Sequence, residues 1–179
     1  MHPGESSKRA VSSGGSIDAL PDGVLEHILG FLPAPEAVRM CVLARRWRYL
    51  WRSAPGLRVG WPDDGEQALP PVKEHRELVD RLLLLRGGSP LDTCDIRLGE
   101  FQDDDVPRVN FWVWHAILCK VSQFTLGIYW HRYLKLDDLP LVSQHLTRLQ
   151  LRGVWVYSSF LDFSSCPALE YLELLCCNL

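Results

Sequence analysis

The sequence lacks any apolar stretch long enough to cross a membrane. A membrane-spanning helix needs roughly 18 or more apolar residues in succession, and none of the 179 residues belongs to such a run. The opening segment, MHPGESSKRAVSSGGS, also lacks the apolar centre of a signal peptide, and its Ser and Gly content predicts a disordered tail over residues 1–16. We therefore expect an intracellular protein, in the nucleus, the cytoplasm or both, with no membrane partner.

The sequence also lacks the motifs of metal sites and catalytic sites. It has no Gly-rich phosphate loop and no G-x-S-x-G, and His75, His115 and His131 lie outside metal-binding motifs. No C-x-x-C pair occurs, and two of the cysteines are adjacent, which is poor spacing for zinc. The six cysteines are Cys41, Cys94, Cys119, Cys166, Cys176 and Cys177. We predict buried free thiols, no cofactor or metal, and a protein that is not an enzyme.

Charge of either sign is modest overall but unevenly placed. The net charge is −3 at pH 7 and the pI is near 6.1, which argues against a dedicated nucleic-acid-binding protein. With 47% hydrophobic and 23% charged residues, the chain is expected to form one or two packed domains. Residues 37–62 contain no acid and present a local positive field. Their arginines are Arg39, Arg45, Arg46, Arg48, Arg52 and Arg58.

The segment VLARRWRYLWRSAPGL, residues 42–57, mixes four of these arginines with two tryptophans and a tyrosine. Such a mixture suits a nucleic-acid surface, where arginines neutralise phosphates and aromatic rings stack on bases. It also suits a helix that buries its tryptophans in a protein partner and keeps its arginines at the rim. Helical spacing favours the second interpretation, because one face would carry Leu43, Trp47, Leu50 and Trp51.

Two more helices are predicted before this segment. In LPDGVLEHILGFLP, Asp22 is the expected N-cap and Pro33 ends the helix. The apolar residues at helical spacing are Val24, Leu25, Ile28, Leu29 and Leu32. A second helix begins near Pro35 and Glu36. Because a core of about 40 residues usually needs a partner, a metal or a disulfide, and neither of the last two is evident, we expect a protein partner.

The stretch IDALPDGVLEHILGFLPAPEAVRMCVLARRWRYLWRSAPGL resembles the F-box of plant F-box proteins. The resemblance rests on the Leu-Pro-Asp opening, the Ile-Leu pair and the Val-Leu-x-x-Arg-Trp-x-x-Leu-Trp run. It implies a three-helix module over residues 17–57 that packs on an acidic Skp-type adaptor and, through it, joins a cullin. The implied adaptor-binding residues are Leu20, Pro21, Val24, Leu25, Ile28, Leu29, Val42, Leu43, Arg46, Trp47, Leu50 and Trp51. The other arginines would lie at the rim and speed association.

Residues 58–88 are predicted to form a linker followed by an amphipathic helix. WPDDGEQALPP contains Pro, Gly and acids but shows no periodicity. In EHRELVDRLLLLRGG, Gly87 is the expected C-cap of a helix. One face of that helix would carry Leu78, Val79, Leu82 and Leu85.

Residues 89–179 contain an irregular repeat. LDTCDI at 91, VSQFTL at 121, LTRLQL at 146 and LEYLEL at 169 have apolar residues at their first, fourth and sixth positions. Their spacing is near that of leucine-rich repeats, and LEYLELLCCNL fits the whole L-x-x-L-x-L-x-x-[NC]-x-L pattern. Each unit is expected to form a short strand that buries its apolar side against its neighbours. Since the sequence ends in the last unit, we expect an incomplete array with an exposed apolar edge.

A helix is predicted between the first two repeat units, in PRVNFWVWHAILCK. Its apolar face would carry Val109, Trp112, Val113, Ala116 and Ile117. The acidic run EFQDDD precedes this helix. Its negative charge suits the positive end of the helix, and a substrate-binding patch is the less favoured interpretation.

The predicted fold class is α+β to α/β, an N-terminal three-helix F-box followed by a short, irregular leucine-rich-repeat solenoid. This order resembles that of plant F-box/LRR proteins, and the early end of the sequence resembles a truncated member of the F-box/LRR/FBD type. The resemblance implies a non-catalytic subunit of an SCF-type (Skp-cullin-F-box) ubiquitin ligase, whose repeats recruit an unidentified protein target for ubiquitin-dependent degradation, with no nucleic-acid partner. Two alternatives stay open: a truncated or inhibitory protein that binds the adaptor and recruits no target, and, less favoured, an Arg/Trp nucleic-acid-binding module.

Overall fold

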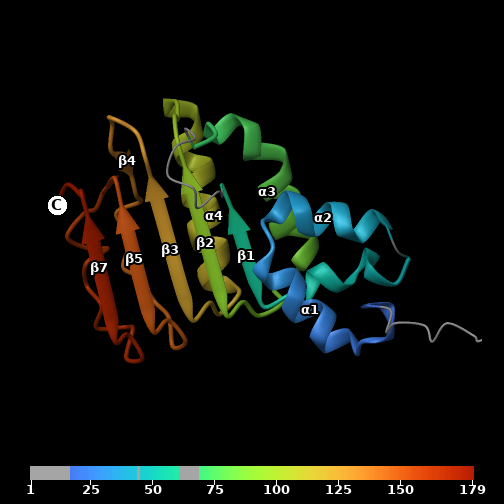
Figure 1. The fold of residues 1–179 in the computed structure, drawn as a ribbon. Coiled ribbons are helices and arrows are strands. Elements are labelled where there is room, and N and C mark those ends of the chain that lie inside the picture. Colours follow the sequence, from blue (N-terminus) through green and yellow to red (C-terminus); the bar gives the residue numbers. More distant parts are fainter. Residues whose placement is uncertain (1–16, 44, 61–68) are drawn as a thin grey trace, which may run out of the picture.

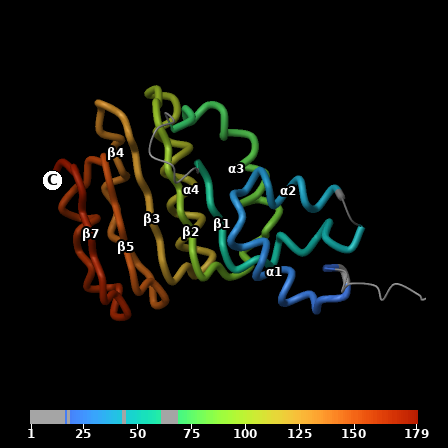
Figure 2. The backbone as a smooth tube through the Cα atoms, in the orientation of Figure 1, coloured from blue at the N-terminus to red at the C-terminus, as the bar shows by residue number. Residues whose placement is uncertain are grey.

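The structure is a computed structural model that describes residues 17–43, 45–60 and 69–179. The predicted disordered tail and most of the predicted linker lie outside these residues. A parallel sheet forms the body of the molecule, with α3 and α4 behind it and α1 and α2 at the end nearest β1 (Figure 1). The backbone trace in Figure 2 runs from these helices, strand by strand, to the C-terminal strand at the opposite edge.

The N-terminal segment contains two of the three expected α-helices. Its first elements are a 3₁₀ turn η1 (Ile17–Ala19), α1 (Asp22–Phe31) and α2 (Ala34–Leu43). Helix α1 ends as predicted, because the residue before Pro33 is pushed to an extended conformation. The predicted N-cap was wrong: Pro21 occupies that position, and Asp22 is the first helical residue.

The third predicted helix is replaced by two short 3₁₀ turns, η2 (Arg45–Arg48) and η3 (Leu50–Arg52). A 3₁₀ turn repeats every three residues, so Trp47 and Trp51, four apart, no longer share one face. Trp47 is buried in the N-terminal core, whereas Trp51 packs against that core and also against the core of the sheet. The two tryptophans therefore have different neighbours.

The main sheet has five strands in the order β1-β2-β3-β5-β7, and every neighbouring pair is parallel. Its strands are β1 (Gly56–Val59), β2 (Thr93–Leu98), β3 (Gln123–Ile128), β5 (Arg148–Arg152) and β7 (Tyr171–Leu175). A second, two-stranded parallel sheet pairs β4 (Leu134–Lys135) with β6 (Val154–Trp155). Each of the four repeat units contributes one strand of the main sheet.

The repeat strands lie in register. Cys94 pairs with Phe124, and the same row continues through Leu149 to Leu172. Two residues further along, a second apolar row contains Ile96, Leu126, Leu151 and Leu174. In β2, burial alternates from one residue to the next, as expected for a strand with one covered face. The predicted mixture of helix and sheet is confirmed.

The first strand, β1, was not anticipated. It follows η3 closely and pairs with β2, Gly56 lying opposite Thr93 and Val59 opposite Ile96. Its four residues, GLRV, are too few to show a strand period in the sequence. Because β1 spans residues 56–59, the predicted boundary between residues 57 and 58 falls inside a strand of the main sheet.

The long helices are α3 (Val72–Arg86) and α4 (Val106–Leu118), the latter preceded by a 3₁₀ turn η4 (Asp103–Asp105). Gly87 adopts a left-handed conformation (φ 60°), which confirms the expected C-cap of α3. The prediction for Leu85 was wrong: its side chain is 50% exposed, and Leu83 and Arg86 are buried instead. Helix α3 packs against both η3 and α4. Its buried face is therefore rotated relative to the predicted one, toward Leu83 and Arg86 and away from Leu85.

The predicted face of α4 is confirmed. Val109, Trp112, Val113 and Ala116 are buried, and Ile117 is half-buried. The indole nitrogen of Trp112 donates a hydrogen bond of 2.7 Å to Asp80 on α3. This bond holds the two long helices together behind the sheet.

The acidic run before α4 is held by arginines from other parts of the chain. Arg76 contacts both Asp104 and the buried Asp105, and Arg132 lies 2.7 Å from Asp103. Asp105 also accepts a hydrogen bond from the backbone N–H of Gln102. These contacts agree with a structural role at the start of the helix. Among the described helices, none has the length and apolar character needed to cross a membrane.

Candidate functional site

The N-terminal helices have a small core of their own. Leu25, Leu29 and Trp47 are each at most 1% exposed. They pack with the buried residues Ala37, Cys41 and Ala54. Three of the predicted adaptor-binding residues are therefore interior residues of the free chain.

Other predicted adaptor-binding residues lie on the surface. Pro21 and Val24 are exposed, and Val42 is 81% exposed, which is a high value for a valine in a folded segment. Leu20, Ile28, Leu50 and Trp51 are partly buried. Leu43 ends α2, and its side chain lies outside the described part of the structure.

Two exposed aromatic residues of this segment escaped the sequence analysis. Phe31 is 57% exposed and Tyr49 is 60% exposed. Phe31 follows Ile28 by three residues and Val24 by seven, so helical spacing could have placed it beside them. Tyr49 lies between two 3₁₀ turns, and neither residue was assigned to a predicted apolar face. Together with Val24 and Val42, they are four exposed apolar or aromatic side chains in a short segment, a feature typical of surfaces that bind a protein partner.

The arginines of this segment are placed close to its aromatic rings. The guanidinium carbon of Arg52 lies 5.2 Å from the Tyr49 ring centroid, and that of Arg58 lies 5.7 Å from the ring of Phe31. These distances allow cation–π contacts. Arg52 and Arg58 thus lie over exposed rings, where the surface is both apolar and positive.

Arg46 has a specific partner in α1. Its Nε and Nη2 lie 2.8 and 2.6 Å from Oδ1 of Asp22. The pair ties η2 to the first turn of α1. Because both side chains are largely exposed, the pair contributes at most about 1 kcal/mol to folding and serves mainly to orient the two segments.

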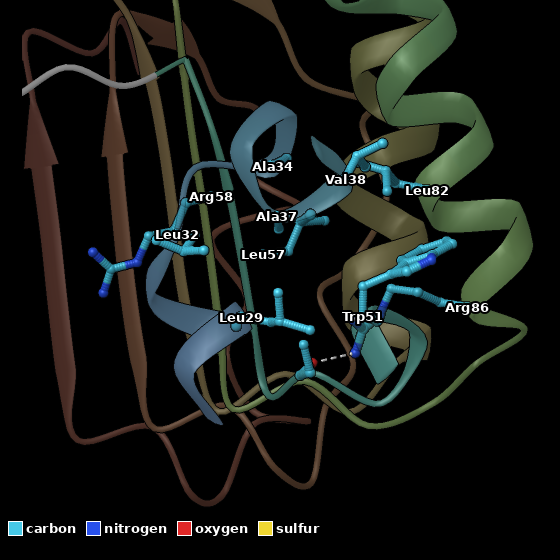
Figure 3. A pocket seen from close by; sticks show the side chains of 12 residues that line it. Leu29, Leu32, Ala34, Ala37, Val38, Trp51, Leu57, Arg58, Leu82 and Arg86 are labelled. Carbon is cyan, nitrogen blue, oxygen red and sulfur yellow. Dashed lines mark hydrogen bonds between the residues drawn. The ribbon is translucent and has the colours of Figure 1, made fainter. Parts of the chain in front are cut away.

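Arg86 connects the N-terminal helices to the sheet. Its side chain, 4% exposed, reaches from the end of α3 toward Trp51 (Figure 3). It donates hydrogen bonds to the backbone carbonyls of Trp51 (3.1 Å), Ala54 (2.7 Å) and Pro90 (3.2 Å). Among the described residues, no carboxylate pairs with Arg86, and burial lowers the pKa of its guanidinium. Three carbonyl dipoles therefore take the place of a counter-ion.

The junction around Arg86 is closely packed. It leaves a cavity of about 20 Å³, room for about one water molecule. Leu29 from α1, Leu57 from β1 and Leu82 from α3 line it (Figure 3). Side chains of the N-terminal helices and of the sheet thus meet in one apolar contact.

A signal for Arg86 was present in the sequence. Arg86 follows Val79 by seven residues and Leu82 by four, so it lies on the buried stripe of α3. A charged residue on such a stripe points to a buried hydrogen-bonding role. The sequence does not show which groups accept its hydrogen bonds, because these depend on the tertiary packing of η3 against α3.

The cysteines are free, and four of the six are buried as predicted: Cys41, Cys94, Cys119 and Cys166. Burial raises the pKa of each of these four thiols. The prediction of burial was wrong for Cys176, which is exposed, and Cys177 is intermediate. Among the described residues, no group of three or more His, Cys, Asp or Glu side chains is placed to hold a metal ion.

Comparisons with known proteins agree with this architecture. The F-box domain family matches residues 17–58. The F-box/LRR-repeat protein At4g14096 of Arabidopsis thaliana is 32% identical over 141 residues, covering 75% of this chain and 29% of the relative. The F-box/LRR-repeat protein At3g59190 of Arabidopsis thaliana is 32% identical over 176 residues, covering 94% of this chain and 45% of the relative.

A more distant relative, the putative F-box/LRR-repeat protein At5g02930 of Arabidopsis thaliana, is 27% identical over 186 residues, which cover 90% of this chain and 38% of the relative. The chain thus spans less than half the length of these curated relatives. No solved structure gives a significant match. The helical segment with its small core, its continuation into a parallel sheet of repeated strands, and the two kinds of match lead to one conclusion: the chain is an F-box protein, homologous over most of its length to plant F-box/LRR-repeat proteins.

Proposed function

We propose that this protein is the target-recruiting subunit of an SCF-type ubiquitin ligase, with an F-box that binds a Skp-type adaptor and, through it, a cullin. The observation that carries the proposal is the exposed apolar surface of the matched F-box segment, above all Val42, 81% exposed beside a core that is already closed. A partner that covers this surface removes apolar area from water, which favours association. The intracellular setting, nucleus or cytoplasm, belongs to the same proposal.

The adaptor surface is proposed to have two layers. Pro21, Val24 and Val42 contact the adaptor directly, and the half-buried Leu20, Ile28, Leu50 and Trp51 border the contact, with Leu43 assigned to it from the sequence alone. The buried Leu25, Leu29 and Trp47 hold the outer layer in place. Arg46 orients η2 through Asp22, and the neighbouring arginines attract an acidic adaptor.

The mechanism we propose is proximity, with no chemistry performed by this chain. F-box family proteins are generally non-catalytic adaptor subunits, and a ubiquitin carried elsewhere in the ligase would react with a lysine of the bound target. Holding two reactants together replaces an encounter in solution by a reaction within one complex. A closely packed junction between F-box and sheet suits this task, because it limits the positions that a bound target can take relative to the adaptor.

The sheet is proposed to be a short leucine-rich-repeat array that holds the target. Its support is the one-strand-per-unit arrangement, in which the apolar rows of four units align across parallel strands. The outward face of these strands is free of covering helices in Figure 1 and offers a surface for a protein segment.

The adaptor proposal is tested by charge substitution on the exposed surface. Val42→Asp and Val24→Asp are expected to reduce adaptor binding by tenfold or more, because each places an unpaired charge in an apolar contact, at about 2 kcal/mol or more. The measurement is co-purification and affinity with a purified Skp-type adaptor. Leu84→Asp on α3, where Leu84 is 65% exposed, is the matched control and should bind normally.

Equal adaptor affinity for all three variants would contradict the proposed surface. A second measurement is co-purification from plant extract. If the chain recovers the adaptor but no target protein, the result favours the alternative of a truncated or inhibitory protein that binds the adaptor without recruiting a target.

A further inference from the structure

The outward face of the sheet carries an excess of positive charge. Residues that point away from α3 and α4 lie in rows set by the strand register. The charged side chains of these rows are Arg58, Arg97, Arg148, Arg152, Asp95 and Glu173. Four cations thus stand against two acids on this face, in a chain whose net charge is −3. The imbalance makes the face locally attractive to a negatively charged partner.

The acids of this face already have partners within the sheet. Asp95 lies 3.0 Å from the guanidinium Nε of Arg97 in an ion pair. Glu173 accepts a hydrogen bond from Gln150, whose carbonyl accepts one from the hydroxyl of Thr125. These bonds form a continuous polar ladder across β3, β5 and β7. The acids are therefore committed to neighbours and leave Arg152 without a carboxylate.

Arg152 is held against a tyrosine ring. Its guanidinium carbon lies 4.6 Å from the ring centroid of Tyr129, and it forms no ion pair among the described residues. An arginine stacked in this way keeps the edge of its guanidinium plane available for a planar carboxylate. The side chain is thus oriented before any partner arrives.

A glycine makes this stacking geometrically feasible. Gly127 lies between Arg97 and Arg152 in one row of the sheet, and a Cβ at this position would come within 2.7 Å of the Tyr129 ring. The missing side chain lets the Tyr129 ring lie close to the sheet. Around it is a hollow of about 180 Å³ that Arg97, Gly127, Tyr129 and Arg152 help to line.

An aromatic hollow adjoins the arginine. It has a volume of about 520 Å³ and shares Tyr129 and Arg152 with the first hollow. Trp130 and Tyr133 supply further exposed rings, and His131 and Cys176 also line it. The positive Arg152 guanidinium thus lies beside a hollow lined by aromatic rings. A ligand that fits both would carry a negative group next to an apolar side chain.

We propose that this face binds an extended, acidic peptide segment of the target protein, with an Asp or Glu carboxylate on Arg152 and a neighbouring aromatic or large apolar side chain in the hollow of Tyr129, Trp130 and Tyr133. This inference rests on the proposed recruiting function and names the chemistry of the target. Three interstrand steps of about 4.8 Å separate β2 from β7, a distance of about 14 Å that about five extended residues span. A nucleic acid fits less well, because it carries a negative phosphate at every nucleotide and so brings more charge near Asp95 and Glu173 than a peptide with one carboxylate placed on Arg152.

The experiment uses the full chain and a phage-displayed library of random peptides about a dozen residues long. We expect the selected peptides to be enriched in Asp or Glu next to an aromatic or large apolar residue. A synthetic copy of a selected peptide is then measured by fluorescence polarisation, beside a copy in which its acids are replaced by the corresponding amides. Arg152→Gln should weaken the acidic peptide about tenfold or more and leave the amide copy nearly unchanged.

Two controls separate recognition from folding. Arg81→Gln makes the same change of charge on α3, where Arg81 is 77% exposed, and should bind the peptide like the parent chain. Trp130→Ala should weaken peptides with an aromatic neighbour more than those without one. The melting temperature of each variant shows whether the fold is retained.

The inference is overturned if the selected peptides show no acidic enrichment, or if Arg152→Gln binds the acidic peptide as tightly as the parent chain does. It is also overturned if a single-stranded oligonucleotide, but no peptide, binds in an Arg152-dependent way. Adaptor affinity, measured on the same preparations, distinguishes this failure from failure of the F-box proposal, since the Arg152→Gln chain retains the whole F-box surface.

Discussion

At the scale of single residues, the most informative side chain is Arg86. A buried guanidinium with no carboxylate partner is costly. Here its two terminal nitrogens donate to three backbone carbonyls, from η3, the turn before β1 and the segment before β2, whereas its buried Nε has no partner among the described residues. The Trp51 carbonyl also accepts a hydrogen bond from the backbone N–H of Ala54, just after η3. The residue therefore completes the hydrogen bonding of the junction and fixes its geometry.

Replacement of Arg86 tests this role. Arg86→Met keeps much of the apolar stem but leaves the three carbonyls without that donor, so we expect the free energy of unfolding to fall by about 2–4 kcal/mol. Arg86→Lys keeps the charge but not the planar guanidinium, so it should lower the free energy of unfolding by a smaller amount. Denaturant unfolding measures both, with Arg81→Met on the exposed side of the same helix as control. An unchanged stability of Arg86→Met would mean that other donors, or water, satisfy the carbonyls.

At the scale of elements, α1 crosses β1 at two glycines. A Cβ on Gly56 would come within 2.2 Å of the carbonyl oxygen of Gly30, and one on Gly30 would come within 2.8 Å of the Gly56 nitrogen. Both obstacles are backbone atoms, which cannot turn aside as a flexible side chain can. This close approach seats α1 on the edge strand and lets Leu29 and Leu57 line the same junction.

The glycine crossing predicts opposite effects for two Gly→Ala changes. Gly56→Ala should destabilise the fold by about 1–3 kcal/mol, because α1 must move away from β1. Gly23→Ala, in α1 with no atom near its added methyl group, should be neutral or stabilise the fold by up to about 1 kcal/mol through helix propensity. Thermal and denaturant unfolding provide the comparison. Equal stabilities of the two variants would show that the crossing adjusts without strain.

At the scale of the whole molecule, the F-box segment and the main sheet share a strand and a hydrophobic core. β1 belongs to the main sheet yet overlaps the residues matched by the F-box family, 17–58. Trp51 packs against both hydrophobic cores, and Ala34 of α2 belongs to the core of the sheet. The two parts therefore depend on each other for burial of their apolar side chains.

Shared packing predicts cooperative unfolding. We expect the full chain to unfold in one transition, with the same midpoint by tryptophan fluorescence and by far-ultraviolet circular dichroism. A fragment limited to residues 17–60 should be unfolded or much less stable, because it would expose Leu57 and Val59, which are buried in the full chain. Two separate transitions, or a stable fragment, would show that the F-box folds independently of the sheet.

By itself, the sequence determined those features that depend on local periodicity and local stereochemistry. The apolar spacing predicted α1, α2, α3 and α4, the glycine at 87 marked the end of α3, and the alternation in four repeat units identified the four strands β2, β3, β5 and β7. The F-box motif located the candidate adaptor site in the same way. Each of these signals lies within a short stretch of chain, where the side-chain period reflects one buried face.

Only the tertiary structure decided which side chains those faces meet. The split of the third helix into η2 and η3, the strand β1, the burial of Arg86 and the exposure of Val42 all depend on contacts between segments far apart in the chain. A period shows that a residue lies on an apolar face, but not whether that face is covered. Leu25 and Val42 therefore look alike in the sequence, and only the packing of α1, α2 and η2 makes one a core residue and leaves the other exposed.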